Sequence, residues 1–259
     1  MASEEIEMNV DIADKAIAVT GAAGGIGRAL ALGLAADGAR VAVLARDRQR
    51  AQHVVDEIAR LPHAPAALAV EADVSDETAV REAAATLDRA WGRLDALINN
   101  AGWMHPASTI LDLDVATLRR ALDSNLVSAY LTTKHFAPLM IRGGGGRILY
   151  LSSAAGVQCG PGMSPYGSAK AGVNVLANVA HQELADDGIR TTALAPGLTY
   201  SPGMREIVGD EHLGRVAAQY PGGRIGEPED LVGLAAFLCS DAARHLSGST
   251  MFVRPPVNG

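Results

Sequence analysis

Cysteine is scarce in this chain of 259 residues, which contains only Cys159 and Cys239. Two isolated cysteines form neither a disulfide framework nor a zinc or redox motif. The seven histidines show no ligand-like spacing either. We therefore predict neither a disulfide-stabilised fold nor a metal site.

The chain also lacks long apolar runs and any excess of positive charge. No apolar run approaches the roughly 20 residues that a membrane-spanning helix needs. Residues 1–15 are acidic and have no apolar centre, so we expect neither a signal peptide nor a transit peptide. A net charge of −7 argues against nucleic acid as the main partner. The simplest interpretation is a soluble cytoplasmic protein that binds a small molecule rather than a nucleic acid or a membrane.

Nothing in the sequence divides the chain into parts. It shows no internal repeat, low-complexity tract or linker, and its 48% of hydrophobic residues suffices for one sizeable core. We predict a single dinucleotide-binding and catalytic domain over residues 1–259, with residues 1–12 as a flexible N-terminus.

Apolar strands alternate with helical patterns along the whole chain. The predicted strands are 15–21, 40–45, 65–74, 94–100, 146–153, 189–197 and 249–254, and the longest later helices are 115–141, 164–187 and 228–239. Seven strands joined by helical crossovers predict an α/β fold of the Rossmann type, a doubly wound three-layer sandwich with a seven-stranded parallel sheet.

A glycine-rich turn follows the first predicted strand, in the segment TGAAGGIG (20–27). Gly21, Gly25 and Gly27 would let the backbone turn sharply and approach a pyrophosphate. The next helix would then offer free N–H groups and its positive dipole end to the phosphates. This position, at the first strand–helix junction, favours dinucleotide binding.

Several further motifs occur in register with this turn. They are NNAG (99–102), Asn125, the serine pair Ser152 and Ser153, YGSAK (166–170), and the pair Pro196 and Gly197. In order and spacing they resemble the short-chain dehydrogenase/reductase family, over residues 12–253. The resemblance implies a Rossmann fold, a nicotinamide cofactor and an oxidoreductase activity.

The resemblance also implies a catalytic set of four residues. Tyr166 would be the general acid–base, and Lys170 its electrostatic partner and a ligand of the nicotinamide ribose. Ser153, preferred to Ser152, would bind the substrate oxygen, and Asn125 would hold a water in a proton relay to Lys170. An isolated tyrosine has a pKa of about 10, which a nearby ammonium group and an oxidised nicotinamide would lower.

Most cofactor contacts are likewise expectations from the family. Asp73 and Val74 would contact the adenine and Asn99 the adenosine ribose, while Pro196 and Gly197 would lie under the nicotinamide. The full expected set is Gly21, Gly25, Ile26, Gly27, Arg46, Asp73, Val74, Asn99, Ala101, Gly102, Tyr166, Lys170, Pro196, Gly197, Thr199 and Ser201.

The choice between the two nicotinamide dinucleotides depends on the end of the second strand. An acid there would bind the 2′-hydroxyl of NAD, but the position holds Ala45 and is followed by Arg46. A guanidinium pairs well with a phosphate, so we predict NADP(H) rather than NAD(H). Arg48 could assist, whereas Arg40 and Arg50 are expected to have solvated structural roles. Gly24 stands where NADP-dependent relatives often carry a basic residue.

The segments that contact substrate in this family carry large, mostly apolar side chains here. We expect contacts from Trp103, Cys159, Met163 and Met204, and more broadly from Met104, His105, Val157 and Tyr200. This composition favours a hydrophobic ketone or alcohol, although the same residues could instead pack the lid of the site.

Three alternatives to a ketone reductase remain open at this stage. The first is a reductase of ketoacyl groups on a carrier protein, although Glu183, Asp186 and Asp187 make the helix after the active site acidic. The second is a dehydratase or epimerase on the same scaffold, and the third a sensor without catalysis.

Association with further copies of the chain is also predicted. Small residues at Ala169, Ala171, Gly172 and Ala177 suit a helix-mediated homodimer or homotetramer. The atypical end at Arg254, Pro255 and Pro256 makes the larger assembly less certain.

Overall fold

Seven strands form one parallel sheet in the order β3-β2-β1-β4-β5-β6-β7 in the computed structural model, which describes residues 10–220 and 222–254. The predicted fold class is thereby confirmed, and the order reverses between β1 and β4. The strands are β1 (Ala16–Thr20), β2 (Arg40–Ala45), β3 (Leu68–Glu71), β4 (Ala96–Asn99), β5 (Gly146–Leu151), β6 (Ile189–Pro196) and β7 (Ser249–Val253).

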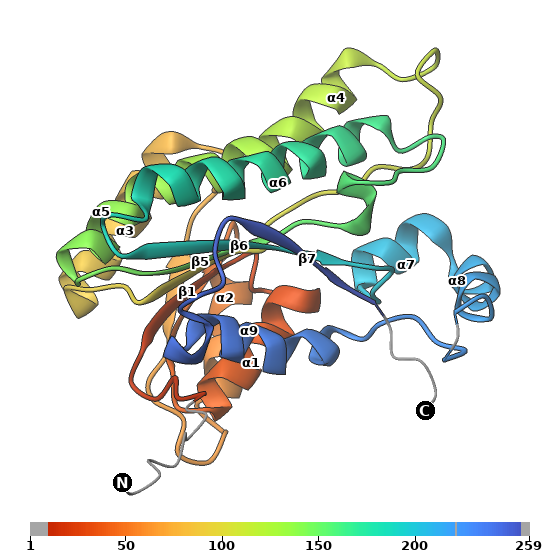
Figure 1. Ribbon diagram of the computed structural model, residues 1–259. Helices are drawn as coiled ribbons and strands as arrows, with labels where there is room; N and C mark the ends of the chain where they lie inside the picture. Colours follow the sequence, from red (N-terminus) through yellow and green to blue (C-terminus); the bar gives the residue numbers. More distant parts are fainter. Residues whose placement is uncertain (1–9, 221, 255–259) are drawn as a thin grey trace, which may run out of the picture.

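Helices cover both faces of this sheet (Figure 1). One face carries α1 (Gly25–Ala36), α2 (Arg48–Ile58) and α9 (Val232–Cys239), and their apolar sides share a buried cluster with the sheet. The other face carries α3 (Glu77–Trp91), α4 (Val115–Leu122), α5 (Ser128–Arg142) and α6 (Ser164–Leu184), most of which pack in a second cluster. Burial on both faces explains why the strands are continuous apolar runs.

The third strand is shorter than the sequence suggests. We predicted residues 65–74, but β3 spans only Leu68–Glu71, at one edge of the sheet. It pairs with β2 over Ala42–Ala45, and beyond that point the chain of β2 turns away into α2. Ala72 still donates its N–H to the carbonyl of Ala45 at 2.8 Å, but the pairing with β2 does not continue over residues 73–74.

The predicted helix 115–141 is interrupted. Between α4 and α5 lies η1 (Asp123–Val127), a π-helical turn that contains Asn125. Single π turns inside α-helices are frequent at functional sites. Hydrophobic periodicity alone does not reveal such a turn, because the apolar side chains continue on both sides of it.

Two short helices that the sequence did not predict follow β6. They are α7 (Pro202–Val208) and α8 (Asp210–Ala217), which lie beyond the carboxyl ends of the strands (Figure 1). They pack through a small apolar cluster of Met204, Leu213 and Ile225, separate from the two main clusters. Three short 3₁₀ turns, η2 (Ala154–Gly156), η3 (Pro228–Leu231) and η4 (Asp241–Ala243), complete the connections.

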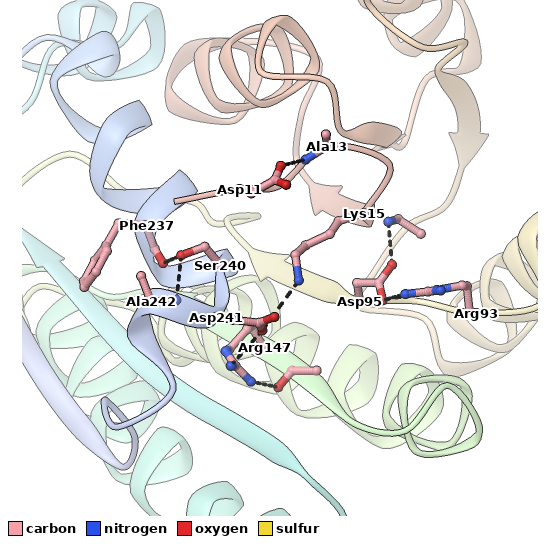
Figure 2. A network of polar contacts seen from close by, with 12 residues as sticks. Asp11, Ala13, Lys15, Arg93, Asp95, Arg147, Phe237, Ser240, Asp241 and Ala242 are labelled. Carbon is pink, nitrogen blue, oxygen red and sulfur yellow. Dashed lines mark hydrogen bonds and ion pairs between the residues drawn. The ribbon is translucent and has the colours of Figure 1, made fainter. Parts of the chain in front are cut away.

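The amino ends of the strands are joined by a polar network (Figure 2). Asp95 Oδ2 accepts the N–H of Ala16 at 2.7 Å, and its other oxygen accepts from the Arg93 guanidinium. On the other side of the network, Asp241 Oδ1 lies 3.6 Å from Lys15 Nζ and 3.4 Å from Arg147 Nη2. The side chain of Asp95 is 13% exposed, whereas that of Asp241 is 80% exposed.

This difference in exposure predicts different stability effects for the two carboxylates. Asp95→Ala should lower the free energy of unfolding by about 1–3 kcal/mol, because it leaves the Ala16 N–H without its acceptor in a nearly dry site. Asp241→Ala, the matched control, should cost less than about 1 kcal/mol, because exposed ion pairs are screened by water. Urea unfolding of both variants checks this, and equal losses would contradict it.

The sequence predictions for the two ends of the chain fall mostly on residues outside the described part. Of the N-terminal segment 1–12, residues 1–9 lie outside the described part, but Ile12 is buried and packs in the core beneath α1. Pro255 and Pro256 also lie outside the described residues. Within residues 10–220 and 222–254, no helix is both long and apolar enough to cross a membrane.

Candidate functional site

Two adjoining cavities lie along the carboxyl edge of the sheet. The larger has a volume of about 810 Å³ and the smaller about 510 Å³. Both are bordered by Gly21, Gly24, Ala101, Gly102 and Trp103, so they form one continuous cleft. Ligands of open α/β sheets bind at this edge, near the point where the strand order reverses.

The glycine turn after β1 forms the floor of this cleft. Gly21 has a φ of +64°, and a Cβ there would lie 2.9 Å from the Cα of Ala101. Helix α1 begins next, with Gly24 as a cap that has no side-chain acceptor and with no acidic residue in the first turn. The N–H groups at this helix start are thus free to bind an anion, which fits a pyrophosphate.

Asn100 supports the glycine turn. Its Nδ2 donates to the carbonyl of Thr20 at 2.9 Å and to that of Gly21 at 3.3 Å, and its backbone N–H donates to the Thr20 hydroxyl. The sequence instead predicts a cofactor contact at Asn99. Asn99 is buried behind the cleft, where its Oδ1 accepts from Thr132 Oγ1 at 2.5 Å.

Tyr166 and Lys170 lie in the first turns of α6 and border the larger cavity. Lys170 Nζ is 5.6 Å from the centroid of the Tyr166 ring and donates to the carbonyl of Leu151 at 2.6 Å. Burial raises the pKa of the Tyr166 hydroxyl, and a hydrogen bond with Ser153 partly opposes that rise. Burial also lowers the pKa of the Lys170 ammonium to about 8.

The two serines after β5 have different surroundings. Ser152 is buried, and its Oγ donates to the carbonyl of Lys170 at 3.1 Å, which braces α6 against β5. Ser153 is less buried, and its Oγ accepts from the N–H of Ala155 at 3.2 Å. Since its proton is not required by that bond, Ser153 can donate to a ligand, and this favours Ser153 over Ser152.

Asn125 is tied to α4 and to the loop after β4 that borders the cleft. Its Nδ2 donates to the carbonyls of Trp103 at 2.8 Å and of Ala121 at 2.9 Å, and its Oδ1 faces the N–H of Trp103 at 3.3 Å. A Cβ at Gly102 would lie 2.6 Å from Asn125 Oδ1 and 3.5 Å from Lys170 Nζ. Gly102 therefore allows these two side chains to meet at the cleft.

Most of the expected cofactor residues border one of the two cavities. Arg46, Asp73 and Val74 line the smaller cavity. The hydrogen bond from Ser75 lowers the pKa of the Asp73 carboxyl, with a smaller contribution from Arg46. The following line the larger cavity: Gly25, Ile26, Tyr166, Lys170, Pro196, Gly197, Thr199 and Ser201.

Gly27 and Asn99 do not reach the lining of either cavity. Gly27 lies behind the turn, where a Cβ would be 2.4 Å from Asn100 Nδ2, so its role is close packing. With these two exceptions, the free helix start, the narrow glycine floor and the cavity shape fit a dinucleotide.

The expected substrate residues are only partly brought together. Trp103, Met163 and Met204 line the larger cavity, and Met104 joins them. Cys159 is exposed and lies outside the lining, with its Sγ 3.5 Å from the carbonyl of Met163. His105 and Val157 do not line this cavity either: His105 is buried beside a separate side cavity of about 380 Å³, and Val157 is exposed.

Four charged residues that border the cleft were not predicted from the sequence. Asp47, Arg50 and Arg120 line the smaller cavity, and Glu206 lines the larger one. Arg50 was expected to be structural, but its Nη2 would lie 3.6 Å from a Cβ at Gly24. In the sequence, only its spacing from Arg46 along the predicted helix indicated that Arg50 could reach the same site. No motif marks Arg120 or Glu206.

No group of three or more His, Cys, Asp and Glu side chains in the described ranges is placed to hold a metal ion.

Comparison with known proteins agrees with this geometry. Residues 21–254 match the model of a family described as enoyl-(acyl carrier protein) reductase. The chain is 35% identical over 240 residues to the 3-oxoacyl-[acyl-carrier-protein] reductase FabG of Staphylococcus aureus, covering 92% of this chain and 96% of that protein.

Solved structures of similar proteins contain nicotinamide dinucleotides. A 7α-hydroxysteroid dehydrogenase complexed with NADH and 7-oxo glycochenodeoxycholic acid has a TM-score of 0.89 and 33% identity, over 95% of each chain. A putative NAD(P)-dependent gluconate 5-dehydrogenase from Beutenbergia cavernae, with bound NADP, has a TM-score of 0.87 and 33% identity, over 95% of this chain and 97% of that one.

The fold, the cleft and these matches lead to one assignment. The chain belongs to the short-chain dehydrogenase/reductase family, as an oxidoreductase that uses a nicotinamide cofactor and acts on CH–OH and C=O groups.

Proposed function

We propose that this protein interconverts a ketone and a secondary alcohol with NADP(H), and that Tyr166 is the general acid–base. The observation that carries the proposal is the placement of Tyr166, Lys170, Ser153 and Asn125 on one cavity. That cavity adjoins the glycine turn at the start of α1. A hydride acceptor or donor and a proton-transfer group would thus meet at one carbonyl.

Each residue has a distinct part in the proposed reduction. A nicotinamide cofactor held at the glycine turn and the start of α1 would supply the hydride for the carbonyl carbon. The Tyr166 hydroxyl donates its proton to the carbonyl oxygen, while Ser153 donates a hydrogen bond to the same oxygen. The Lys170 ammonium stabilises the tyrosinate that forms, and Asn125 fixes the backbone of Trp103 beside it. Oxidation of the alcohol reverses these steps.

The pKa shifts suit the direction of reduction. Because burial raises the pKa of Tyr166, the protein alone holds this hydroxyl in its proton-donating form at neutral pH. The lowered pKa of Lys170, about 8, leaves the ammonium protonated at neutral pH but not in alkaline solution. Loss of that proton removes the charge that stabilises the tyrosinate.

The kcat/KM for ketone reduction should therefore fall as the pH rises through about 8, the pKa of Lys170. Initial rates from about pH 6 to about pH 10 measure this profile. Lys170→Arg is the matched variant, because a guanidinium keeps its charge throughout this range. Its rates should be lower, but without the decline above pH 8. A wild-type profile that stays flat to about pH 10 would contradict the role of Lys170.

The preference for NADP(H) is supported by the residues around the smaller cavity. Ala45 ends β2 without an acid, and Arg46 follows it at the cavity wall. The guanidinium of Arg50 lies over Gly24. This side chain of α2 thus supplies the positive charge that the glycine turn itself lacks. Two guanidinium groups from adjacent turns form a suitable site for a 2′-phosphate.

The experiment that tests the function is a panel of ketones and secondary alcohols assayed with NADPH, NADH and their oxidised forms. Turnover is followed at the absorbance band of the reduced nicotinamide. We expect net oxidation of NADPH with apolar ketones, and a lower kcat/KM with NADH. A dehydratase or epimerase would convert its substrate with no net change in this band, and a sensor would show no turnover.

A second candidate is the reduction of 3-oxoacyl groups on a carrier protein. The identity of 35% to the FabG protein favours it. The acidic residues at the end of α6 and directly after it, including Glu183 and Asp187, disfavour an acidic carrier. Acetoacetyl carrier protein, compared with a simple thioester of the same acyl group, separates the two proposals.

A homodimer or homotetramer remains a prediction, as does a cytoplasmic location. Ala169 and Ala177 are buried in the protein core, so they cannot form a contact between copies. Exposed apolar side chains on α5 and α6 include Tyr130, Val175 and Val179. These support a helix-mediated dimer better than the small residues do.

A further inference from the structure

Charged side chains are distributed unevenly along the cleft. The smaller cavity carries three arginines, Arg46, Arg50 and Arg120, against the two carboxylates Asp47 and Asp73. Among the residues that line the larger cavity, the charged ones are Lys170 and Glu206. The end proposed to hold the phosphates is thus mainly positive, and the substrate end carries an exposed negative charge.

Glu206 is held at the wall of the larger cavity by the way α7 packs. Ser201 caps this helix, its Oγ accepting from the N–H of Met204 at 3.2 Å. Met204 is buried in the apolar cluster under α7 and α8. With Met204 turned inward, Glu206 and Ile207 border the cavity, and Glu206 remains exposed to solvent.

The charge of Glu206 is not neutralised by its neighbours. The adjacent Arg205 is engaged elsewhere, because its Nε and Nη2 donate to the two oxygens of Asp210, both at 2.6 Å. Lys170 is buried, and its Nζ donates to the carbonyl of Leu151. Among the described residues, no side chain forms an ion pair with Glu206.

The rest of the substrate end is apolar. Met104, Met163, Ile207 and Tyr220 line it beside Glu206. A substrate that fills it would meet apolar walls around its body and one carboxylate near the entrance. A cationic group at that position is attracted, whereas a carboxylate or phosphate is repelled in a partly desolvated site.

We infer that Glu206 is a specificity-determining residue, which selects apolar ketones or alcohols that carry an ammonium group and rejects anionic ones. The inference rests on the proposed function, since it assumes that the larger cavity holds the substrate. It also implies that acidic carriers and substrates with a terminal carboxylate are poor ligands of this cleft.

Three ketones that share one apolar skeleton test the inference. At the end remote from the carbonyl, the first carries a primary ammonium, the second a neutral hydroxyl and the third a carboxylate. With the wild-type protein and NADPH, we expect kcat/KM for the ammonium ketone to exceed that for the carboxylate ketone by about tenfold or more at low ionic strength. Glu206→Gln should reduce this ratio to about twofold, and Glu206→Lys should invert it. Added salt should reduce the ratio in the wild type but not in Glu206→Gln.

Glu211→Gln is the matched control. Glu211 lies on the neighbouring α8, pairs with Arg215 and does not line the cavity. The same change of net charge there should leave the ratio at its wild-type value. If the Glu211 variant changes the ratio as much as the Glu206 variant does, the effect belongs to overall charge and the inference is wrong.

A binding measurement separates this inference from the proposed function. The affinities of the three corresponding alcohols for the complex of protein and NADPH, measured by calorimetry, should follow the same order without any turnover. If the wild type shows this order of affinities and Glu206→Gln loses it, the inference is supported even when no ketone is reduced. In that case only the proposed function fails. An unchanged ratio in Glu206→Gln overturns the inference, whatever the rates are.

Discussion

Tyr166→Phe should lower kcat for ketone reduction by about 10²–10⁴-fold, the range that a positioned acid–base group contributes. The variant removes only the hydroxyl, so the ring should keep its place beside the larger cavity and 5.6 Å from Lys170 Nζ. Since the proposed cofactor site centres on the glycine turn and the smaller cavity, the Kd for NADPH should change less than about threefold. Steady-state rates and fluorescence titration of NADPH measure the two quantities.

Tyr130→Phe provides the control for this substitution. Tyr130 lies on α5 with 53% of its surface exposed, and it lines neither cavity. Its loss of a hydroxyl should leave both kcat and cofactor affinity at wild-type values. Wild-type turnover in Tyr166→Phe would refute the assignment of the acid–base. A parallel loss of cofactor binding would instead indicate a collapsed site.

Arg46→Ala and Arg50→Ala should each raise the KM for NADPH by about tenfold, with little change in the KM for NADH. A charge-assisted hydrogen bond to a phosphate contributes about 1.5–3 kcal/mol, and the exposure of both side chains puts the expected effect near the lower limit. Their effects should not simply multiply in the double variant, because groups that contact one phosphate are coupled. Initial rates at varied concentrations of NADPH and NADH measure the KM for each cofactor in each single variant.

Arg48→Ala distinguishes a specific phosphate contact from general positive charge. Arg48 lies between the other two in sequence, is exposed, and borders neither of the two cavities. Its removal should leave the KM for NADPH within about twofold of the wild type, apart from long-range screening. A wild-type enzyme that uses NADH as efficiently as NADPH would contradict the preference itself.

These two predictions differ in how far they depend on the tertiary structure. Tyr166, Lys170, Ser153 and Asn125 were all selected from motifs in the sequence, and the structure places the four on one cavity. Arg46 was selected from its position after the second strand. Arg50 was assigned a solvated structural role, because a helical position five residues after Ala45 gives no indication that the side chain turns back over Gly24.

The residues at the substrate end of the cleft depend on the tertiary structure even more strongly. Met163, Met204 and Trp103 were expected there and line the larger cavity. Cys159 was expected too, but its side chain turns away from the lining. Glu206 was overlooked because α7 was not predicted. A helix of seven residues that begins at a proline leaves too short a periodic pattern to recognise.

The sequence by itself determined the fold class, the order of the strands and main helices, and the motifs that we propose to be catalytic. Those features depend on local patterns: apolar runs that suit a covered parallel sheet, helical periods, and a glycine turn that only one backbone conformation satisfies. Each of these patterns lies within a short stretch of consecutive residues.

The tertiary structure alone decided the short β3, the π turn at Asn125, the burial of Asn99 and the places of Arg50 and Glu206. The physical reason is common to all five. Each depends on which distant segment lies opposite a residue: a strand that has ended, a backbone carbonyl, a threonine on α5, a glycine turn, or the apolar cluster under α7. Such contacts produce no periodic pattern in the sequence. They result from packing between distant segments and not from local conformational preference.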